Sequence, residues 1–431
     1  MTAGAALLLS FAALLFIGTP IAVALGFAGI VGIYLGLDVY ALATVGTNTY
    51  NGIAKYPLIA IPLFILTGMI FERSGVAKAL VTFASAIVGP RRGGLAVVAV
   101  LVCLMMGGMS GSGPADAAAV AMVMIPSMMK AGYPKPFAAS VIAAGASTAI
   151  LIPPSVALIV YSILVPGADL RALFAGGIVP GLLAGLAIIL PVLWLSRRHD
   201  LGAAEDPTRP NIWKAFVGAI PGLMAPVIIL GGLRSGLFTP TEAAVVAVAY
   251  GIIVGMVIYR SIGLRDLYQV FVDSAVTSGI IMLIISLAGI FAWAGATLGT
   301  FDAAAEALLS VSDNQWVILG MIMVFLLLAG MVLDGISIYL IMLPLLMPIV
   351  TAFQWNVTWF GVVMAMNIAI GQFTPPVAVN LMVTTTVAGV PMESTFRWIL
   401  WLVLSMGLAL IAVLVWPELV LAIPRALGYR V

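Results

Sequence analysis

Two segments of the chain combine glycines with hydroxyl or carboxylate side chains inside otherwise apolar sequence. Residues 107–119 read GGMSGSGPADAAA, and residues 330–340 read GMVLDGISIYL. Hydroxyl, carboxylate and backbone carbonyl oxygens are the ligands that hard cations prefer. Because ionisable groups are costly inside a membrane, those found there are usually functional. The pattern therefore predicts cation binding.

A Pro-Pro pair follows each of these segments. Pro153-Pro154 and Pro375-Pro376 lie 222 positions apart, 375 minus 153. A proline inside a helix removes one backbone hydrogen bond and frees a carbonyl oxygen. In lipid, a freed carbonyl persists only where protein, water or an ion satisfies it. Helices interrupted at matching places in the two halves of an apolar chain indicate the ion and substrate site of a transporter.

We therefore pair each polar tip with the proline-broken segment that follows it. Residues 110–113 and 145–153 form one predicted sodium site, and residues 330–335 and 371–375 form the other. Each broken segment supplies a threonine and freed carbonyls, and each tip supplies hydroxyl or carboxylate oxygens. The alternative for any single residue is that glycine and serine only allow the helices to pack closely.

Helix ends at the two tips direct their positive dipole ends toward the middle of the membrane, which favours an anionic substrate. The hydroxyls of Ser110, Ser112 and Ser155 are the polar groups that we place nearest to that substrate. Neither tip contains Lys or Arg. Dipoles, hydroxyls and coupled cations must therefore balance the substrate's charge.

Three acidic residues stand in apolar surroundings. Asp334, at the second tip, is predicted either to bind sodium or to stabilise the tip. Asp116 follows Gly-Pro at a predicted helix start, where helix capping is the simpler interpretation. Glu242 lies three residues after Thr239, which is the spacing of a capping box.

These residues belong to a chain that must cross a membrane many times. Of its 431 residues, 63% are hydrophobic and only 8% are charged, whereas soluble domains carry roughly 25% charged residues. Apolar runs at 172–196, 236–259, 275–301 and 398–416 are long enough to span a bilayer as helices. No basic residues precede the N-terminal apolar stretch, which reaches about residue 35, so we interpret it as the first span and not as a signal peptide.

Composition excludes several classes of function. The single Cys and the single His are far apart, which argues against a disulfide and a structural metal site. The net charge of +2 does not indicate a nucleic-acid partner. Serine-protease chemistry needs a base beside the serine, and His199 lies in a charged linker. The chain also lacks metalloprotease and ATPase motifs. We therefore predict that it is not an enzyme.

The predicted fold is an all-α polytopic membrane protein built as an inverted repeat. Each half holds scaffold helices, a re-entrant hairpin whose arms are too short to cross the bilayer, and a broken helix. The predicted segments are the first half at 1–196 with its hairpin at 94–130 and broken helix at 136–165, a cytoplasmic linker at 197–214, and the second half at 215–431 with its hairpin at 316–352 and broken helix at 357–389.

Charges at the bases of the hairpins predict opposite orientations. Basic residues, including Arg91 and Arg92, flank the first hairpin, whereas Asp302, Glu306 and Asp313 precede or begin the second. By the positive-inside rule, the first hairpin opens from the cytoplasm and the second opens from the outside. Matched elements of opposite orientation are typical of secondary transporters.

The stretch from GGMSGSGPADAAA to ILIPPS resembles the large membrane subunit of TRAP transporters, the tripartite ATP-independent periplasmic transporters. GLFTPTEAAVVAVAYG, MVLDGISIYLIMLPLLMPI and GQFTPPVAVNLMV resemble it as well, so the likeness spans essentially the whole chain. It implies an elevator-type transporter of the ion-transporter superfamily, located in the bacterial inner (cytoplasmic) membrane. Such proteins take up carboxylates or sulfonates, usually with sodium.

The resemblance also implies partners and ligands. Such subunits work with a small four-helix membrane subunit and a periplasmic substrate-binding protein, and sodium ions are the only cofactor expected. The sodium sites of the family fall here on Ser110, Ser112, Gly145, Thr148 and Pro153, and on Gly330, Asp334, Gly371, Thr374 and Pro375, with Gly335 at the second tip.

Two related functions stay open at this stage. A proton-coupled or uniporting carrier of the same fold would use Asp334 or Asp116 as its titratable group. A dicarboxylate carrier that works alone would read Ser-Asn-Thr at its hairpin tips, which this chain lacks. A channel is disfavoured because paired, opposed hairpins suit alternating access. The substrate itself is not specified by the sequence.

Overall fold

The computed structural model describes residues 2–202 and 209–431, and over these ranges the chain is helical with no strand. The predicted all-α class is thus confirmed. The elements are α1 (Ala3–Phe16), α2 (Ile21–Gly36), η1 (Val39–Ala43), α3 (Thr44–Ile53), η2 (Tyr56–Ile59), α4 (Ala60–Arg73), α5 (Val76–Val88), α6 (Gly94–Ser110), α7 (Gly113–Lys130), α8 (Lys135–Ser147), η3 (Thr148–Ile150), α9 (Val156–Leu164), α10 (Leu170–Arg198), α11 (Ile212–Ser235), α12 (Pro240–Ile252), η4 (Ile253–Ile258), α13 (Leu264–Thr297), α14 (Thr300–Leu309), α15 (Gln315–Gly330), α16 (Gly335–Ala352), α17 (Val357–Gly371), α18 (Val379–Ala388), η5 (Met392–Thr395), α19 (Phe396–Val415) and α20 (Glu418–Ala426).

Seven helical segments in the described part of the chain are long and apolar enough to cross a membrane. This agrees with the multi-pass character expected from composition. The seven are Tyr56–Arg73, Leu170–Arg198, Ile212–Ser235, Pro240–Ile258, Leu264–Thr297, Gly335–Ala352 and Met392–Val415.

The N-terminal apolar stretch is not one continuous span, contrary to the sequence expectation. It forms two shorter helices, α1 and α2. Gly18 has a left-handed backbone, with φ of 84°, and Pro20 is the N-cap of α2. Pro20 lacks an N–H group, and the left-handed residue before it cannot continue a right-handed helix. The turn therefore forms at Gly18–Pro20.

Two pairs of helices are joined by tight turns. Each arm was expected to be too short to cross the bilayer, but α16 is among the seven segments that are long enough. α6 and α7 are separated by Gly111 and Ser112 alone, and they pack against each other. α15 and α16 are joined by residues 331–334. Pro126 lies inside α7 without interrupting it, as does Pro348 inside α16.

The helix that follows each pair is interrupted at a Pro-Pro sequence. α8 passes into η3 and stops, and the chain becomes helical again only at α9. α17 stops at Gly371, and α18 begins at Val379. The Pro153-Pro154 and Pro375-Pro376 peptide bonds are both cis. Both breaks therefore contain a cis Pro-Pro bond, but they differ beyond it, because Ala378 before α18 has a positive φ of 49° and Ser155 before α9 is extended.

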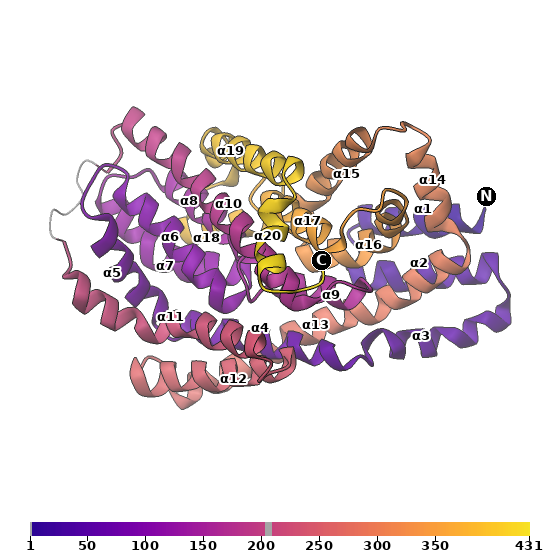
Figure 1. Cartoon of the computed structure of the whole chain (residues 1–431), viewed down its shortest axis with the longest axis horizontal. Helices are drawn as coiled ribbons and strands as arrows, with labels where there is room; N and C mark the ends of the chain where they lie inside the picture. Colours follow the sequence, from indigo (N-terminus) through magenta and orange to yellow (C-terminus); the bar gives the residue numbers. More distant parts are fainter. Residues whose placement is uncertain (1, 203–208) are drawn as a thin grey trace.

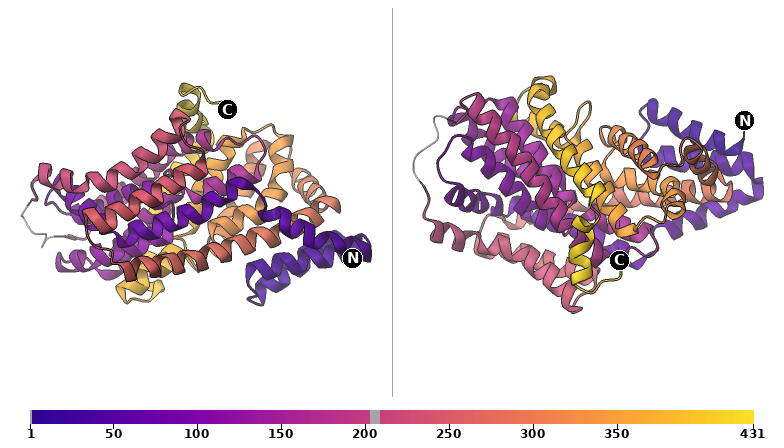
Figure 2. Two further views of the ribbon diagram at one scale, coloured as in Figure 1. Left: turned by 90° about the horizontal axis from the view of Figure 1, so that it is seen from below. Right: turned by 45° about the horizontal axis from the view of Figure 1, so that its top comes forward.

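The molecule is elongated, with α5–α8 at one end and α1, α2 and α14 at the other (Figure 1). Figure 2 shows from two further directions that the N-terminal helices extend from one end. The long helix α13 packs against α2, α3, α4 and α16. The two halves interleave, because α7 packs against α18 and α9 packs against α16.

The linker proposed at 197–214 is only partly described. α10 continues to Arg198 and α11 begins at Ile212, while residues 203–208 lie outside the described ranges. Arg92, at the base of the α6–α7 pair, forms an ion pair with Asp200 at 3.0 Å. The base of that pair and the start of the linker therefore lie together.

Candidate functional site

Both turns open onto one cavity of about 170 Å³ between the two halves of the chain. Its wall combines the start of α7, the start of α16, both interrupted helices, and residues of α4 and α13. The lining residues are Ile65, Gly68, Met69, Gly111, Ser112, Gly113, Pro114, Ala115, Ile150, Val156, Ala157, Thr277, Ile281, Asp334, Gly335, Ile336 and Gln372.

The first turn packs directly on the first helix break, as its predicted pairing requires. A Cβ atom on Gly111 would lie 2.4 Å from the Pro154 carbonyl oxygen, and one on Gly107 would lie 2.8 Å from Ala149 Cα. Gly111 also has a positive φ of 60°. Both the backbone conformation and the available space therefore require glycine at position 111.

The second turn meets the second break in the same way. A Cβ atom on Gly371 would lie 2.6 Å from both Cα and C of Gly330. The Met331 carbonyl accepts hydrogen bonds from Val377 N–H at 3.2 Å and Ala378 N–H at 3.0 Å. These contacts place residues 330 and 331 beside residues 371–378, so the second tip adjoins the segment 371–375 with which it was paired.

The two turns differ in how they cap the N-terminus of the helix that follows. Asp334 is the N-cap of α16, and its Oδ2 accepts hydrogen bonds from Ile336 N–H at 3.0 Å and Ser337 N–H at 3.2 Å. Its Oδ1 also accepts a short hydrogen bond from the Ser337 hydroxyl. Ser112, the N-cap of α7, makes no side-chain capping bond. The positive end of α16 is thus occupied by a carboxylate, whereas that of α7 is not.

Asp116 does not cap a helix, so that interpretation is wrong. Asp116 is the fourth residue of α7, one turn beyond the cap position. Its side chain turns back across the tip, where Oδ1 accepts a hydrogen bond from the Ser110 hydroxyl at 2.6 Å. Asp116 is fully buried, and Oδ2 has no hydrogen-bond partner. A buried carboxylate with a free oxygen requires a proton or a cation.

Three of the predicted hydroxyl groups donate to nearby carbonyls, and the Ser155 oxygen also accepts a hydrogen bond from Leu158 N–H at 3.4 Å. Thr148 donates to Gly145 O at 2.7 Å, Thr374 to Ile370 O at 2.6 Å, and Ser155 to Ile150 O at 2.6 Å.

Gly145 packs farther along α6 than the rest of the first predicted site. A Cβ atom there would lie 3.2 Å from both Cβ and Sγ of Cys103. Cys103 precedes the tip residue Ser110 by about two helical turns.

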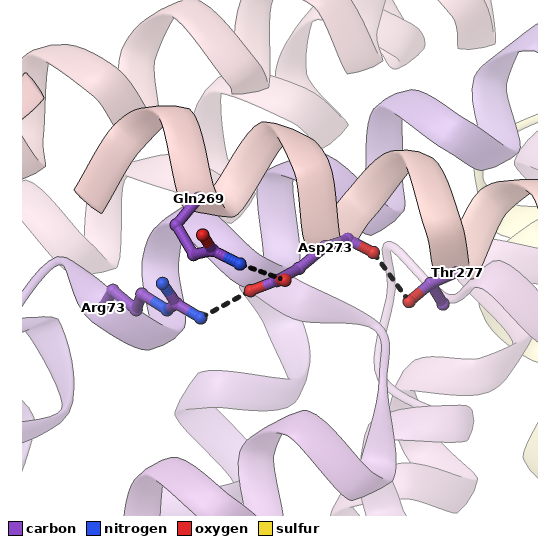
Figure 3. Close-up of polar contacts among 4 residues, drawn as sticks. All are labelled: Arg73, Gln269, Asp273 and Thr277. Carbon is purple, nitrogen blue, oxygen red and sulfur yellow. Dashed lines mark hydrogen bonds and ion pairs between the residues drawn. The ribbon is translucent and has the colours of Figure 1, made fainter. Parts of the chain in front are cut away.

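A polar cluster connects α4 and α13 near one wall of the cavity (Figure 3). Arg73 Nη2 donates to Asp273 Oδ2 at 2.7 Å, and Gln269 Nε2 donates to Asp273 Oδ1 at 2.8 Å. One turn farther, the Thr277 hydroxyl donates to the Asp273 carbonyl at 2.9 Å. Thr277 lines the cavity, so this cluster connects the end of α4 to α13 close to the cavity wall.

Residues 8–419 match the family described as the tripartite ATP-independent periplasmic transporter, DctM component. The chain belongs to the DctM family. It is therefore a multi-pass component of a membrane transporter and not an enzyme, as the sequence indicated.

Relatives of known name support this membership. The DctM-family chain is 36% identical over 405 residues to the 2,3-diketo-L-gulonate TRAP transporter large permease protein YiaN of Escherichia coli, covering 94% of this chain and 95% of the relative. It is 35% identical over 415 residues to the isethionate TRAP transporter permease protein DctMQ of Oleidesulfovibrio alaskensis. That alignment covers 96% of this chain but 64% of the relative, so the chain spans less than two thirds of the longer protein.

A solved structure shows the same fold at low sequence identity. The YdaH transporter of Alcanivorax borkumensis superposes with a TM-score of 0.64 over 89% of this chain and 90% of that chain. The two sequences are 13% identical, so the likeness concerns the fold alone.

The Glu242 side chain of this DctM-family protein forms the predicted capping box. Its Oε2 accepts from Thr239 N–H at 2.7 Å, and its own N–H donates to Thr239 Oγ1 at 3.3 Å. Glu242 thus stabilises the start of α12, and it is not among the described residues that line the cavity.

Sequence reasoning missed Gln372, Asn380 and Thr277. Gln372 lines the cavity, and Asn380 donates its backbone N–H to Gln372 O at 3.0 Å across the second break. Comparison of the two halves could have singled out Gln372 and Asn380. The positions 222 residues earlier are Ile150 and Leu158, so the amides occur in one half only.

Proposed function

We propose that this chain carries a small organic anion across the bacterial inner membrane in symport with sodium. A periplasmic binding protein delivers the anion, and a small four-helix membrane subunit completes the complex. The observation that carries this proposal is the single cavity bounded by both turns and both interrupted helices. Relatives named for isethionate and for 2,3-diketo-L-gulonate make a sulfonate or a carboxylate the substrate class to test.

Sodium would bind where each turn meets its helix break. In the first site the candidate ligands are Ser110, Ser112, Thr148 and carbonyls of residues 145–153. In the second they are Asp334, Thr374 and carbonyls of Gly330, Gly371 and Pro375. Hydroxyl, carboxylate and carbonyl oxygens suit a hard cation. The Gly330–Gly371 contact at the second site brings two backbone segments close enough to share an ion.

Coupling follows if sodium organises the turns that the substrate contacts. The substrate then binds well only to the sodium-loaded form, and each ligand raises the affinity for the other by the same factor. Helices α6–α9 and α15–α18 would move as one block, carrying the cavity across the membrane. The remaining helices, including α4 and α13, would act as the scaffold.

The decisive experiment is uptake into proteoliposomes that contain this chain, its small subunit and its binding protein. Radiolabelled isethionate and 2,3-diketo-L-gulonate are supplied with an inward gradient of either sodium or choline. We expect accumulation only with sodium and only with all three components. Robust uptake by this chain alone would exclude the tripartite proposal, and equal uptake in choline would exclude sodium coupling.

Asp116 supports proton coupling as a second candidate, because a buried carboxylate with an unpartnered oxygen can hold a proton as well as a cation. Asp116→Asn separates the two candidates when sodium and proton gradients are imposed independently. If sodium drives transport, wild-type uptake follows the sodium gradient at any fixed pH. If protons drive it, uptake follows the pH gradient, and Asp116→Asn abolishes that response. The exposed Asp302→Asn change on α14 is the matched control.

A further inference from the structure

Two buried amide side chains face the first residue of α7. From the position that a Cβ atom would take on Gly113, Asn380 Nδ2 lies at 2.9 Å, Asn380 Oδ1 at 3.0 Å and Gln372 Oε1 at 3.0 Å. Gln372 is 5% exposed and Asn380 is fully buried. None of these three atoms has a hydrogen-bond partner. Buried polar atoms are nearly always satisfied, so this cluster is suited to hold a polar ligand.

The N-terminus of α7 offers donors at the same place. The Asp116 N–H makes the first turn bond of this helix, to Ser112 O at 3.1 Å. The N–H groups of Gly113 and Ala115 precede that bond and have no partner within the helix. Pro114 has no N–H, and no side chain caps the helix. The positive end of α7 is therefore open toward the cavity that Gly113 and Ala115 line.

Electrostatics selects an anion for this position. The free N–H groups at a helix N-terminus attract negative charge, whereas the sodium ligands proposed at this turn are oxygen atoms. Gln372 Oε1 faces Gly113, while Nε2 lies toward Gly335, 3.5 Å from the position of a Cβ there. Rotating this amide by 180° would turn Nε2 toward Gly113, because the two ends of an amide are alike in shape. Both Nδ2 and Oδ1 of Asn380 lie near the same point, so this amide can also present its N–H group there.

We propose that the α7 N-terminus, Gln372 and Asn380 form a subsite for one oxyanion group, a carboxylate or a sulfonate, of the transported substrate. This subsite rests on the proposed function, since it assigns the charged end of the organic anion. It uses groups other than the hydroxyls of Ser110 and Ser155. The other helix start at the cavity is closed to a second anion, because Asp334 occupies the N–H groups of α16.

Asn380 also positions Gln372. Its backbone N–H donates to the Gln372 carbonyl at 3.0 Å, which closes the loop around Pro375-Pro376. Residues 222 positions earlier, Ile150 and Leu158, are both apolar. The repeat therefore provides this polar pair once, on the side of the cavity where α7 begins.

The test measures which charge the subsite attracts, using probes whose identity is known. In a Cys103→Ser background, single cysteines replace Ala115, at the subsite, or Ile281, on α13; both line the cavity. Each is labelled with sulfonatoethyl and with aminoethyl methanethiosulfonate, and the ratio of the two rates is measured. We expect the sulfonate preference at position 115 to exceed that at position 281 by about tenfold, the effect of one charged hydrogen bond.

Further variants connect this preference to the amides. Gln372→Leu and Asn380→Leu should lower the ratio at position 115 to that at position 281, and Gln372→Glu, which keeps the size of the side chain, should reverse it. Gln315→Leu, an exposed change of the same type on α15, should leave it unchanged. Equal ratios at the two positions, or a ratio insensitive to all three subsite variants, would show that the amides hold only water and would overturn the proposal.

Each reaction is run in sodium and in choline, so that failure of the subsite proposal can be distinguished from failure of sodium coupling. Sodium coupling predicts that sodium changes the labelling rates at the cavity. If the rates are the same in both salts while the sulfonate preference persists, sodium coupling fails and the subsite stands. If sodium changes the rates and the preference is absent, the subsite fails and sodium coupling stands.

Discussion

Ile150 and Gln372 lie 222 positions apart, one in each half, and both lie beside Gly335 at the start of α16. Measured from a Cβ position on Gly335, Gln372 Nε2 lies at 3.5 Å and Ile150 Cδ1 at 3.9 Å. Ser112 and Asp334 have the same spacing and both begin a helix, yet only Asp334 caps its helix. The repeat thus supplies a symmetric backbone frame, and the polar chemistry of the cavity is asymmetric.

Thr374→Val should raise the sodium concentration needed for half-maximal uptake, by about tenfold if one oxygen ligand of a charged species is lost. The Thr374 hydroxyl donates to Ile370 O at 2.6 Å, which leaves its oxygen free to accept or to bind an ion. Thr386→Val on α18 removes the same kind of bond, to Met382 O at 2.7 Å, away from the cavity. An unchanged sodium curve in Thr374→Val would remove this residue from the second site.

Gly371→Ala should destabilise the protein and abolish uptake. Its Cβ would lie 2.6 Å from backbone atoms of Gly330, and backbone cannot move aside as a flexible side chain can. Overpacking costs typically about 1–3 kcal/mol, and here it also separates the second turn from the second break.

Gly320→Ala is the control for this change, because Gly320 lies within α15 and has nothing within 4 Å of its Cβ position. That variant should be at least as stable as the wild type, since alanine favours a helix more than glycine does. Thermal unfolding in detergent measures both effects. Equal melting temperatures for the two variants would contradict the close contact of Gly371 with Gly330.

Much of this fold could be predicted from the sequence because glycine and proline leave distinct local signals. The Pro-Pro pairs located both helix breaks, and the glycine-rich tips located both turns. Asp116 was misread because the capping rule sees only the local helix start, whereas the side chain bonds across the turn to Ser110. Asn380 lies 267 positions from Gly113 in sequence, 380 minus 113, so no local pattern could place its amide there.

The Arg73–Asp273 ion pair should contribute little to stability despite its short distance. Its side chains are 42% and 37% exposed, and ion pairs with such access to solvent usually contribute about 0.2–1 kcal/mol. A double-mutant cycle with alanine at both positions should give a coupling free energy within that range. The Arg92–Asp200 pair, 63% exposed on both sides and 3.0 Å long, is the reference and should give a smaller coupling. A coupling above about 2 kcal/mol would mean that the cluster is shielded from solvent in the assembled transporter.

Cysteines at Arg92 and Asp313 should react from opposite faces of the membrane. Arg92 lies at the base of the α6–α7 pair and is bonded to Asp200, while Asp313 lies just before α15. The positive-inside rule assigns the basic end to the cytoplasm and the acidic end to the outside.

Cys103 is buried, so replacing it with serine gives a clean background. A membrane-impermeant maleimide applied to intact spheroplasts should label Asp313→Cys alone, and label both variants once the membrane is permeabilised. Labelling of both variants in intact spheroplasts, or of neither, would refute the inverted arrangement of the two halves.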